Sequence, residues 1–431
     1  MDTRALERDL RTYRPAGYDH LPEDFVWPRY GGLSVGNLPA TVVSLLGGGA
    51  RGLLPPLRAD LLDGLTDDVR RVVLVLVDGL GWAQLQRMMA QDDTLIFHRL
   101  AERGRLLPLT TVFPSTTNNV LATLRTGVPP VRHGLLAYEL YLREWQMAVE
   151  CISFSPLAVQ GSAALEDWGF EGETFLPVPS LAQLLSVQGV LTYQVIAKHI
   201  SKGALSQMYF RGMRKVYPHI FASDFWYTVR ETLQSHRGDR FLLSAYWSAV
   251  DTLGHHHGPR HGTALNEVRT LSYLLETSFL DALEPAVREG TLLLMLADHG
   301  HVTTPLERGI ALEDHPALAD MLRLPTLGES RAPFFYARPG HLDAARAYLE
   351  KHFADQMLYL DQDEVLDSGL LGPGDPYREV EHRLGDLVGL MKADVAFARD
   401  HDNLNHLRGR HGGLTAAEML VPLLAVRLDA L

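Results

Sequence analysis

The chain has 431 residues, 46% of them hydrophobic, and a formal net charge of -12. This length accommodates one large α/β domain with insertions, or two domains. The negative charge argues against a nucleic-acid polymer as a partner, because phosphate backbones attract basic surfaces. Cys151 is the single cysteine, which excludes a disulfide framework within the chain and a zinc motif built on cysteines.

The first residues, MDTRALERDLRTYRP, are charged and contain no apolar segment of the kind found in secretory signals. No apolar run in the sequence approaches the roughly 18–20 residues that a membrane span needs. We therefore expect a cytoplasmic protein without a membrane partner.

Strand-like and helix-like patterns alternate along the chain. Residues 1–70 are rich in Pro and Gly and are expected to wrap around the core, with one short helix near 39–46. Strands are predicted at 71–77, 105–113, 149–154, 189–197, 241–247, 291–297 and 419–428, and helices at 82–91, 118–126, 180–187, 222–236 and 262–288. The alternation predicts an α/β fold with a mostly parallel central sheet and helices on both faces.

Residues 311–405 have a different character, with a short strand expected at 334–340, a helix at 341–353 and loop-rich sequence around them. We interpret this segment as an inserted, smaller cap subdomain. The core is then expected to consist of residues 1–310, including the N-terminal wrap, together with residues 406–431.

The stretch FPSTTNN (113–119) stands between a predicted strand and a predicted helix. Ser, Thr and Asn are preferred at helix N-caps, and the free N–H groups at a helix N-terminus suit a phosphate. Taken alone, the stretch predicts a capped helix. It also offers three hydroxyl groups, those of Ser115, Thr116 and Thr117, and leaves open which of them acts as a nucleophile.

Acidic and histidine residues stand at the ends of the predicted strands. They are Asp78 after 71–77, Asp251 and His255 after 241–247, Asp298 and His299 after 291–297, and His411 before 419–428. Since the carboxyl ends of parallel strands meet at one edge of a sheet, these side chains are expected to converge. Asp and His are ligands of divalent transition metals, so three of each predict two divalent ions, with zinc favoured and Mn²⁺ or Fe as alternatives.

Two divalent ions about 3.5–4 Å apart stabilise both the attacking and the leaving oxygen of an in-line displacement. Metal coordination also activates a Thr hydroxyl, which is otherwise a poor nucleophile. The stretch at 113–119 could thus supply a nucleophile as well as a helix cap. The expected partner is a small phosphorylated substrate, with nucleotides as one candidate class.

The motifs that carry these residues follow one another in a recognisable order. They are VLVDGLG (75–81), FPSTTNNVLATLRTGVPPVRHGL (113–135), DTLGHHHGP (251–259), ADHGHV (297–302), RGRHGG (408–413) and EMLVPL (418–423). In this order the sequence resembles the alkaline phosphatase superfamily, and within it the nucleotide pyrophosphatase/phosphodiesterase family. The resemblance implies the α/β fold of that superfamily and a metal-dependent phosphoesterase activity.

The resemblance also implies roles for individual residues. One metal would be held by Asp251, His255 and His411, and the second by Asp78, Thr117, Asp298 and His299. In the family the nucleophile stands ten residues before the Gly of a Thr-Gly pair, and counting back from Gly127 selects Thr117, with Thr116 as the alternative. Where many members carry an Asn after the His-Gly pair, this chain has Tyr138, so Tyr138 and Asn118 are expected to contact substrate. His301 is given no ligand role, and a place behind the ligands, facing substrate or in a loop stays open.

The expected function is hydrolysis of phosphate esters, phosphodiester or nucleotide pyrophosphate bonds in particular, through a phospho-Thr117 intermediate at a two-metal site. One alternative is a phosphonate hydrolase or phosphomutase of the same superfamily. A second alternative is a non-catalytic nucleotide-binding protein. Residues 155–235 and 311–405, which would form the pocket walls, contain no motif that selects a substrate.

Overall fold

The computed structural model describes residues 2–159 and 165–431. Its central sheet has seven strands in the order β2-β18-β9-β1-β8-β6-β7. The strands are β1 (Arg71–Val77), β2 (Arg105–Thr110), β6 (Leu191–Ala197), β7 (Lys215–His219), β8 (Phe241–Trp247), β9 (Thr291–Leu296) and β18 (Leu420–Arg427). Strand β18 runs antiparallel to both of its neighbours, whereas β9, β1, β8, β6 and β7 run parallel. The predicted mostly parallel α/β sheet is confirmed.

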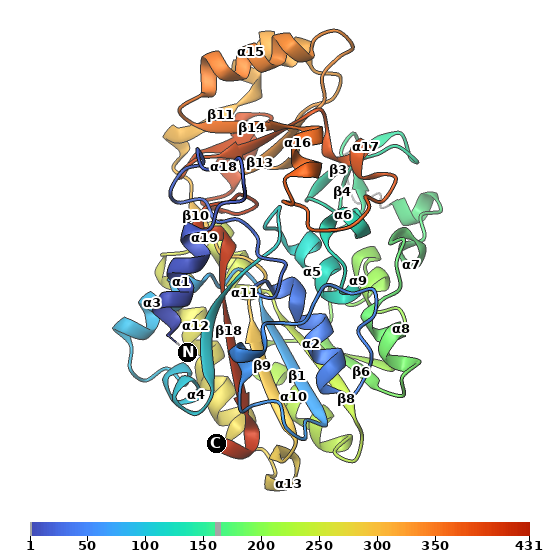
Figure 1. The fold of residues 1–431 in the computed structure, drawn as a ribbon, viewed down its shortest axis with the longest axis vertical. Coiled ribbons are helices and arrows are strands. Elements are labelled where there is room, and N and C mark those ends of the chain that lie inside the picture. Colours follow the sequence, from blue (N-terminus) through green and yellow to red (C-terminus); the bar gives the residue numbers. More distant parts are fainter. Residues whose placement is uncertain (1, 160–164) are drawn as a thin grey trace.

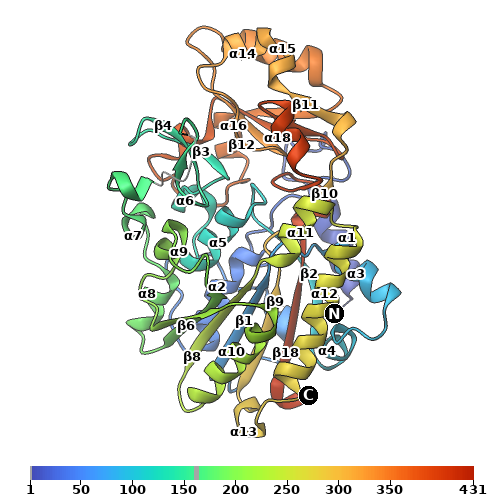
Figure 2. The ribbon, with the colours of Figure 1, turned by 180° about the vertical axis from the view of Figure 1, so that it is seen from behind.

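The two innermost strands explain why the sheet is covered on both sides. Every residue of β1 and of β9 is buried, and their sequences, RVVLVLV and TLLLML, are almost entirely aliphatic. On one face lie α2 (Leu38–Leu45) and α5 (Thr117–Thr126), and on the other lie α10 (Ala222–Ser235) and α12 (Gly262–Leu274) (Figures 1 and 2). The alternation of apolar strands and amphipathic helices therefore predicted the layers correctly.

A second, antiparallel sheet of seven strands lies beyond the carboxyl ends of the parallel strands, at the top of Figure 1. Its strands are β3 (Glu139–Leu142), β4 (Met147–Glu150), β5 (Ser155–Pro156), β12 (Leu327–Glu329), β13 (Ala332–Phe335), β14 (Met357–Asp361) and β15 (Leu387–Met391). The sheet joins residues 139–156 to residues 327–391. A division into a core and a cap formed by 311–405 stays a prediction, and residues 139–156 share the sheet of that segment.

Several local predictions differ from the structure. Helix α1 (Thr3–Thr12) forms in the N-terminal segment that was expected to be irregular. The single helix predicted over 262–288 is instead α12, a π-helical segment (Leu275–Leu280) and α13 (Pro285–Arg288), because Pro285 lacks the N–H that would continue a helix and begins a new one.

The remaining helices connect the strands or cover the second sheet. They are α3 (Trp82–Gln91), α4 (Phe97–Arg103), α6 (Pro130–His133), α7 (Gly172–Phe175), α8 (Leu181–Ser186), α9 (Ala204–Tyr209), α11 (Ala249–His257), α14 (Pro316–Met321), α15 (Leu342–Phe353), α16 (Gln362–Asp367), α17 (Val380–Leu384), α18 (His401–His406) and α19 (Ala416–Met419). Short strands pair outside the two sheets: β10 (Val302–Thr303) with β17 (Gly409–Arg410), and β11 (Gly309–Ala311) with β16 (Ala396–Ala398).

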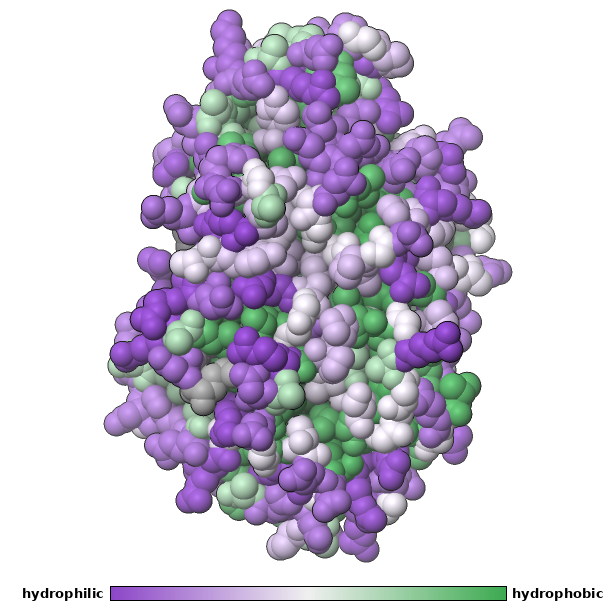
Figure 3. All heavy atoms as spheres, in the orientation of Figure 1, coloured by the Kyte–Doolittle hydropathy of each residue, from purple (hydrophilic) through white to green (hydrophobic). Residues whose placement is uncertain are grey.

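The face of the molecule shown in Figure 3 is mainly hydrophilic, and its apolar residues show in separate areas. Within residues 2–159 and 165–431, none of the helices combines the length and the apolar character that crossing a bilayer requires.

Candidate active site

The predicted site residues converge where the parallel strands end. Asp78 directly follows β1, and Asp298 with His299 follow β9 after Ala297. Asp251 and His255 lie one turn apart on α11, the helix that follows β8. Gly79 allows this convergence: its φ is 74°, and a Cβ there would lie 2.6 Å from an atom of the His301 ring. Only glycine fits both that backbone conformation and that contact.

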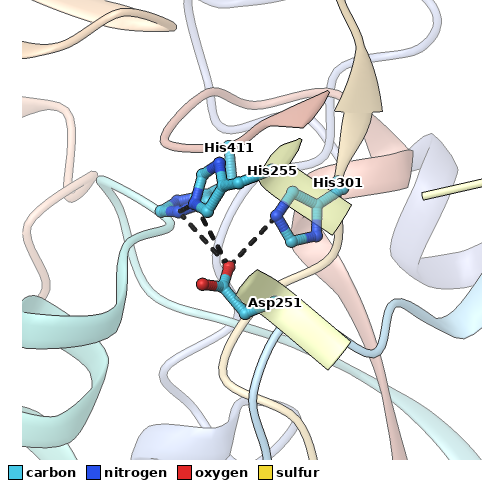
Figure 4. Close-up of side chains that lie close together, drawn as sticks. All are labelled: Asp251, His255, His301 and His411. Atoms are coloured by element: carbon cyan, nitrogen blue, oxygen red, sulfur yellow. Dashed lines mark hydrogen bonds and ion pairs between the residues drawn. The ribbon is translucent and has the colours of Figure 1, made fainter. Parts of the chain in front are cut away.

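A first cluster of metal-ligating side chains surrounds the Asp251 carboxylate (Figure 4). Asp251 Oδ1 lies 3.3 Å from His255 Nε2, 3.1 Å from His301 Nε2 and 3.8 Å from His411 Nε2. The Nε2 atoms of His255 and His411 are 3.2 Å apart. One ligand atom from each of the four residues lies within 4.8 Å of the others, a spacing that could hold a metal ion.

The imidazole rings are fixed from behind by backbone carbonyl groups. Nδ1 lies 2.8 Å from Gly409 O in His255, 3.0 Å from Ser115 O in His411, 3.3 Å from Gly79 O in His301 and 3.2 Å from Gly300 O in His299. Because a carbonyl only accepts hydrogen bonds, each Nδ1 carries a proton, and in a neutral ring the lone pair is then on Nε2. Metal-binding histidines are held in this way, with the second ring nitrogen donating to the protein.

The second cluster contains the Thr117 hydroxyl. Thr117 Oγ1 lies 3.1 Å from His299 Nε2 and 3.5 Å from Asp78 Oδ1. His299 Nε2 lies 3.5 Å from Asp78 Oδ1 and 3.6 Å from Asp298 Oδ2. The Tyr246 hydroxyl donates to Asp78 Oδ2, so the other oxygen of Asp78 faces Thr117.

The adjacent buried carboxylates of these clusters favour the binding of a cation. Burial raises the pKa of Asp78 well above its usual range, and the neighbouring Asp251 and Asp298 carboxylates add to the shift. Burial acts on Asp251 in the same direction, but its imidazole neighbours hold the pKa of Asp251 well below its usual range. The buried Asp298 Oδ2 has no hydrogen-bond partner among the described residues. Adjacent buried carboxylates with an orphaned oxygen fit a bound metal ion.

Two of the histidines fit the same group, whereas the pKa of His301 is raised above its usual range because Asp251 outweighs the opposing effect of burial. Burial lowers the pKa of His255 to about 4 and holds that of His411 well below its usual range. Both rings are therefore neutral at neutral pH, and neutral imidazole is the form that binds metal. The side chains present in the two clusters thus suit divalent metal ions.

The turn before α5 separates the roles of its three hydroxyl groups. Ser115 Oγ donates to Gly413 O at 2.8 Å, which makes it a structural group. Thr116 is the N-cap residue of α5 and its hydroxyl faces the Glu329 carboxylate. Thr117 alone faces Asp78 and His299. The N-cap residue Thr116 makes no side-chain cap, contrary to the expectation of a capped N-terminus. Asn118 Oδ1 accepts from Asn119 N at 3.0 Å, so the N–H groups of Thr117 and Asn118 stay available.

The clusters open into a cavity of about 790 Å³ that elements of both sheets line. Tyr138, predicted to contact substrate, lines this cavity and is 42% exposed. Asn118 is fully buried and its side-chain amide donates to Ala137 O at 2.6 Å. Its side chain is not among those that line the cavity, so Asn118 would contact a substrate through its backbone N–H.

Sequence reasoning gave His301 no ligand role and did not single out Tyr246 or Glu329. His301 faces Asp251, Tyr246 binds Asp78, and Glu329 reaches the cavity from β12. The DHGH motif carried a signal for His301, since it repeats a ligand type two residues after His299. A tyrosine near the end of an apolar strand is usually a packing residue, and Glu329 lies in a segment without a motif, so neither offered a comparable signal.

The chain is similar to known proteins in sequence and in fold. The model of the family described as type I phosphodiesterase/nucleotide pyrophosphatase matches residues 72–414. No curated protein sequence matched the chain. Among solved structures, murine ectonucleotide pyrophosphatase/phosphodiesterase 5, in an inactive form in complex with AMP, has 16% identity and a TM-score of 0.60, over 84% of this chain and 90% of that chain.

A second kind of relative has a similar fold. Phosphonoacetate hydrolase from Sinorhizobium meliloti 1021, in complex with phosphonoformate, has 17% identity and a TM-score of 0.62, over 86% of this chain and 96% of that chain. Both structures share the fold of the alkaline phosphatase superfamily, and the family match covers most of the chain. The chain belongs to the type I phosphodiesterase/nucleotide pyrophosphatase family, a family of metal-dependent phosphoesterases.

Proposed function

We propose that this protein hydrolyses phosphodiester or nucleotide pyrophosphate bonds through a phospho-Thr117 intermediate. The observation that carries the proposal is the position of Thr117: its hydroxyl stands at the N-terminus of α5 and faces Asp78 and His299. A hydroxyl whose only role was capping would bond to an N–H of its own helix, and Thr117 does not cap α5.

The residues of the two clusters would hold two divalent ions. The Asp251 cluster would hold one, and Asp78, Asp298, His299 and Thr117 would hold the other. His301 is an additional candidate ligand in the first cluster, because its Nε2 faces Asp251 at 3.1 Å. Such ions, zinc in the first place and Mn²⁺ or Fe as alternatives, lower the pKa of a bound hydroxyl and neutralise charge on the phosphoryl oxygens.

The chain's own groups then account for the displacement. Thr117 Oγ attacks phosphorus in line: its hydroxyl proton passes to solvent as the bond from Oγ to phosphorus forms, and the bond to the leaving oxygen breaks as that oxygen takes up a proton from water. N–H groups in the first turn of α5, including that of Asn118, are oriented to bind a phosphoryl oxygen at the positive end of the helix dipole. Water then hydrolyses the phospho-Thr117 ester and restores the hydroxyl.

A phosphonate hydrolase activity is the second candidate. It is favoured by the similarity in fold to phosphonoacetate hydrolase, whose TM-score of 0.62 is close to the 0.60 of the ectonucleotide pyrophosphatase. Tyr138, at the position where many members of the family carry an Asn, lines the same cavity as Thr117 and bears on this choice.

A substrate panel tests the proposal. Protein loaded with Zn²⁺ or Mn²⁺ is assayed with bis-p-nitrophenyl phosphate, p-nitrophenyl phosphate, a nucleotide pyrophosphate and phosphonoacetate. The proposal expects the diester and the pyrophosphate to have the highest kcat/KM. A preference for phosphonoacetate would select the second candidate, and turnover of none would leave a non-catalytic nucleotide-binding protein.

A further inference from the structure

The proposed reaction leaves one end of the cavity without a role. Thr117, Leu121 and Arg125 all line the cavity and follow one another at four-residue spacing along α5, so they lie on one face of that helix. Eight residues of helix span about 12 Å. Helical side chains generally lean toward the helix N-terminus, which for Arg125 is the end that carries Thr117.

The Arg125 guanidinium is held but not neutralised. One of its nitrogens, Nη2, donates to Gln194 Oε1 at 2.5 Å. Gln194 is itself fixed, because its Nε2 donates to the backbone oxygen of Val195 at 2.7 Å. Among the described residues, no carboxylate forms an ion pair with Arg125. Burial lowers the pKa of Arg125 to about 10, which leaves the group cationic at neutral pH.

The other arginines that line the cavity are already engaged. Arg399 donates to Glu139 Oε2 at 2.9 Å. Arg410 donates to backbone oxygens of its own loop, including that of Leu404 at 2.9 Å. Within the part of the chain that the structure describes, Arg125 is therefore the arginine of this cavity whose guanidinium has a hydrogen bond at Nη2 alone and no carboxylate partner. The planar fork of a guanidinium matches the two oxygens of a carboxylate or a phosphate.

Much of the cavity lining contributed by α5, β6 and the segment around α9 is apolar. It includes Leu121 of α5, Ile196 of β6, and Ile200, Leu205, Tyr209 and Phe210, with His199 and Ser206 as the polar residues of that segment. The hydroxyl of Tyr209 does not make this lining more polar, because it donates to the backbone oxygen of Asn118 at 2.6 Å. A group that runs from Thr117 to Arg125 would thus meet mostly hydrocarbon and aromatic surface.

We propose that Arg125 forms a second anion-binding subsite, and that the substrate carries a carboxylate or phosphate group joined to the reacting phosphoryl group by an apolar spacer. The inference rests on the proposed function, since it places the phosphoryl group at Thr117. A partly buried cation without a counter-ion is costly, and an anionic substrate group supplies the missing charge. Gln194 is a positioning residue, because it orients the guanidinium toward the cavity.

The test uses p-nitrophenyl diesters whose second ester group is an alkyl chain ending in a carboxylate, a phosphonate or a neutral carboxamide, in a series of chain lengths. The ratio of kcat/KM between charged and neutral chains is measured for the wild-type protein and for Arg125→Met, Arg125→Lys and Arg132→Met. Arg132 is the matched control, because it lies outside this cavity, where it donates to Gly52 O at 3.0 Å. The Arg132→Met variant removes the same charge from the protein as Arg125→Met does.

The subsite predicts that the wild-type protein prefers an anionic chain by about tenfold, which corresponds to one charged hydrogen bond, with a maximum at one chain length. The carboxylate and phosphonate arms show which anion fits. Arg125→Met brings the ratio close to one, Arg125→Lys keeps part of the preference, and Arg132→Met keeps all of it. Should Arg125→Met fail to fold, the wild-type ratio and the Lys variant decide.

Equal kcat/KM for charged and neutral chains at every length would overturn the subsite and leave the proposed function intact. A preference that survives in Arg125→Met would also overturn it. Hydrolysis of none of the diesters by metal-loaded protein would contradict the proposed function, and the inference with it.

Discussion

Ser115 and His411 hold the turn before α5 and the loop of His411 together. His411 Nδ1 donates to Ser115 O at 3.0 Å, and Ser115 Oγ accepts from Gly412 N at 3.2 Å and donates to Gly413 O at 2.8 Å. The residue two positions before Thr117 thus sets the tautomer and orientation of His411. The two clusters are consequently coupled through this turn.

Replacing Ser115 by Ala tests this coupling. The variant loses two hydrogen bonds that fix the loop of His411, so we expect metal affinity to fall about 10–100-fold, as for other groups that orient ligands, while the protein stays folded. Metal titration against a chelator of known affinity measures the effect. Ser153→Ala, on the cavity wall and bonded to Glu150, is the control, and equal affinities in the two variants would contradict the coupling.

In the structure His301 lies among the candidate metal ligands, whereas the resemblance in sequence assigns it no ligand role. If its Nε2 binds metal with Asp251, His301→Ala will lower both the metal content after dialysis and kcat. His256→Ala is the control, because His256 adjoins His255 on α11 but is exposed. Metal content should be unchanged in that control. Retention of full metal content by His301→Ala would leave His301 outside the metal centre.

A buried ion pair joins the second sheet to the loop that contains His411. Arg331, between β12 and β13, donates to both carboxylate oxygens of Glu418, at 3.1 and 3.0 Å, and both side chains are fully buried. Glu418 also accepts from Gly413 N at 2.9 Å. Arg331→Met leaves an unpaired buried charge, and we expect it to lower the free energy of unfolding by about 3–5 kcal/mol. Denaturant unfolding measures this.

The double variant Arg331→Met with Glu418→Gln provides the control for that pair. Because both charges are removed together, it should recover part of the lost stability. If the double variant is destabilised by the sum of the two single changes, the ion pair does not couple them.

Glu329 predicts a pH dependence of stability. Burial raises the pKa of Glu329 from 4.5 to about 8, with smaller contributions from Glu139 and Glu418, while hydrogen bonds from Tyr138 N and the Thr116 hydroxyl oppose the shift. The folded protein therefore keeps a proton that the unfolded chain releases. This favours folding below about pH 4.5 and is progressively lost as the pH rises to about 8.

The Glu329→Gln substitution should remove this loss of folding stability with rising pH. The melting temperature of the variant relative to wild type should rise between pH 5 and pH 8, by an equivalent of at most about 1 kcal/mol per pH unit because part of the carboxyl faces the cavity. Thermal melts across this range measure it. Glu307→Gln, at an exposed position, should show a constant difference from wild type. Parallel pH curves for wild type and Glu329→Gln would contradict the assignment.

The sequence predicted the parallel sheet and the convergence of the Asp and His side chains because both depend on local patterns. Runs such as RVVLVLV (71–77) identify buried strands, and polar residues directly after them mark the functional edge. The antiparallel sheet was not predicted, because it pairs residues 139–156 with residues nearly 200 positions later. Its strands are also short, and neither side carries a periodic pattern strong enough to reveal the pairing.

The same reasoning explains which side chains were missed. Arg125 was read as part of a helix, and its role depends on the cavity that Gln194 and α9 complete around it. The prediction for Asn118 failed to anticipate that its amide binds Ala137 O, because a turn sequence does not show which way a side chain points. The cytoplasmic location stays a prediction.

The central claim is that Thr117 is the nucleophile of a metal-dependent phosphoesterase, and the most direct measurement is turnover and metal content in Thr117→Ala beside Thr116→Ala. The account predicts that kcat falls by at least about 10³-fold in Thr117→Ala while bound metal is retained, and that Thr116→Ala keeps most of its activity. Unchanged turnover in Thr117→Ala, or a loss confined to Thr116→Ala, would contradict it.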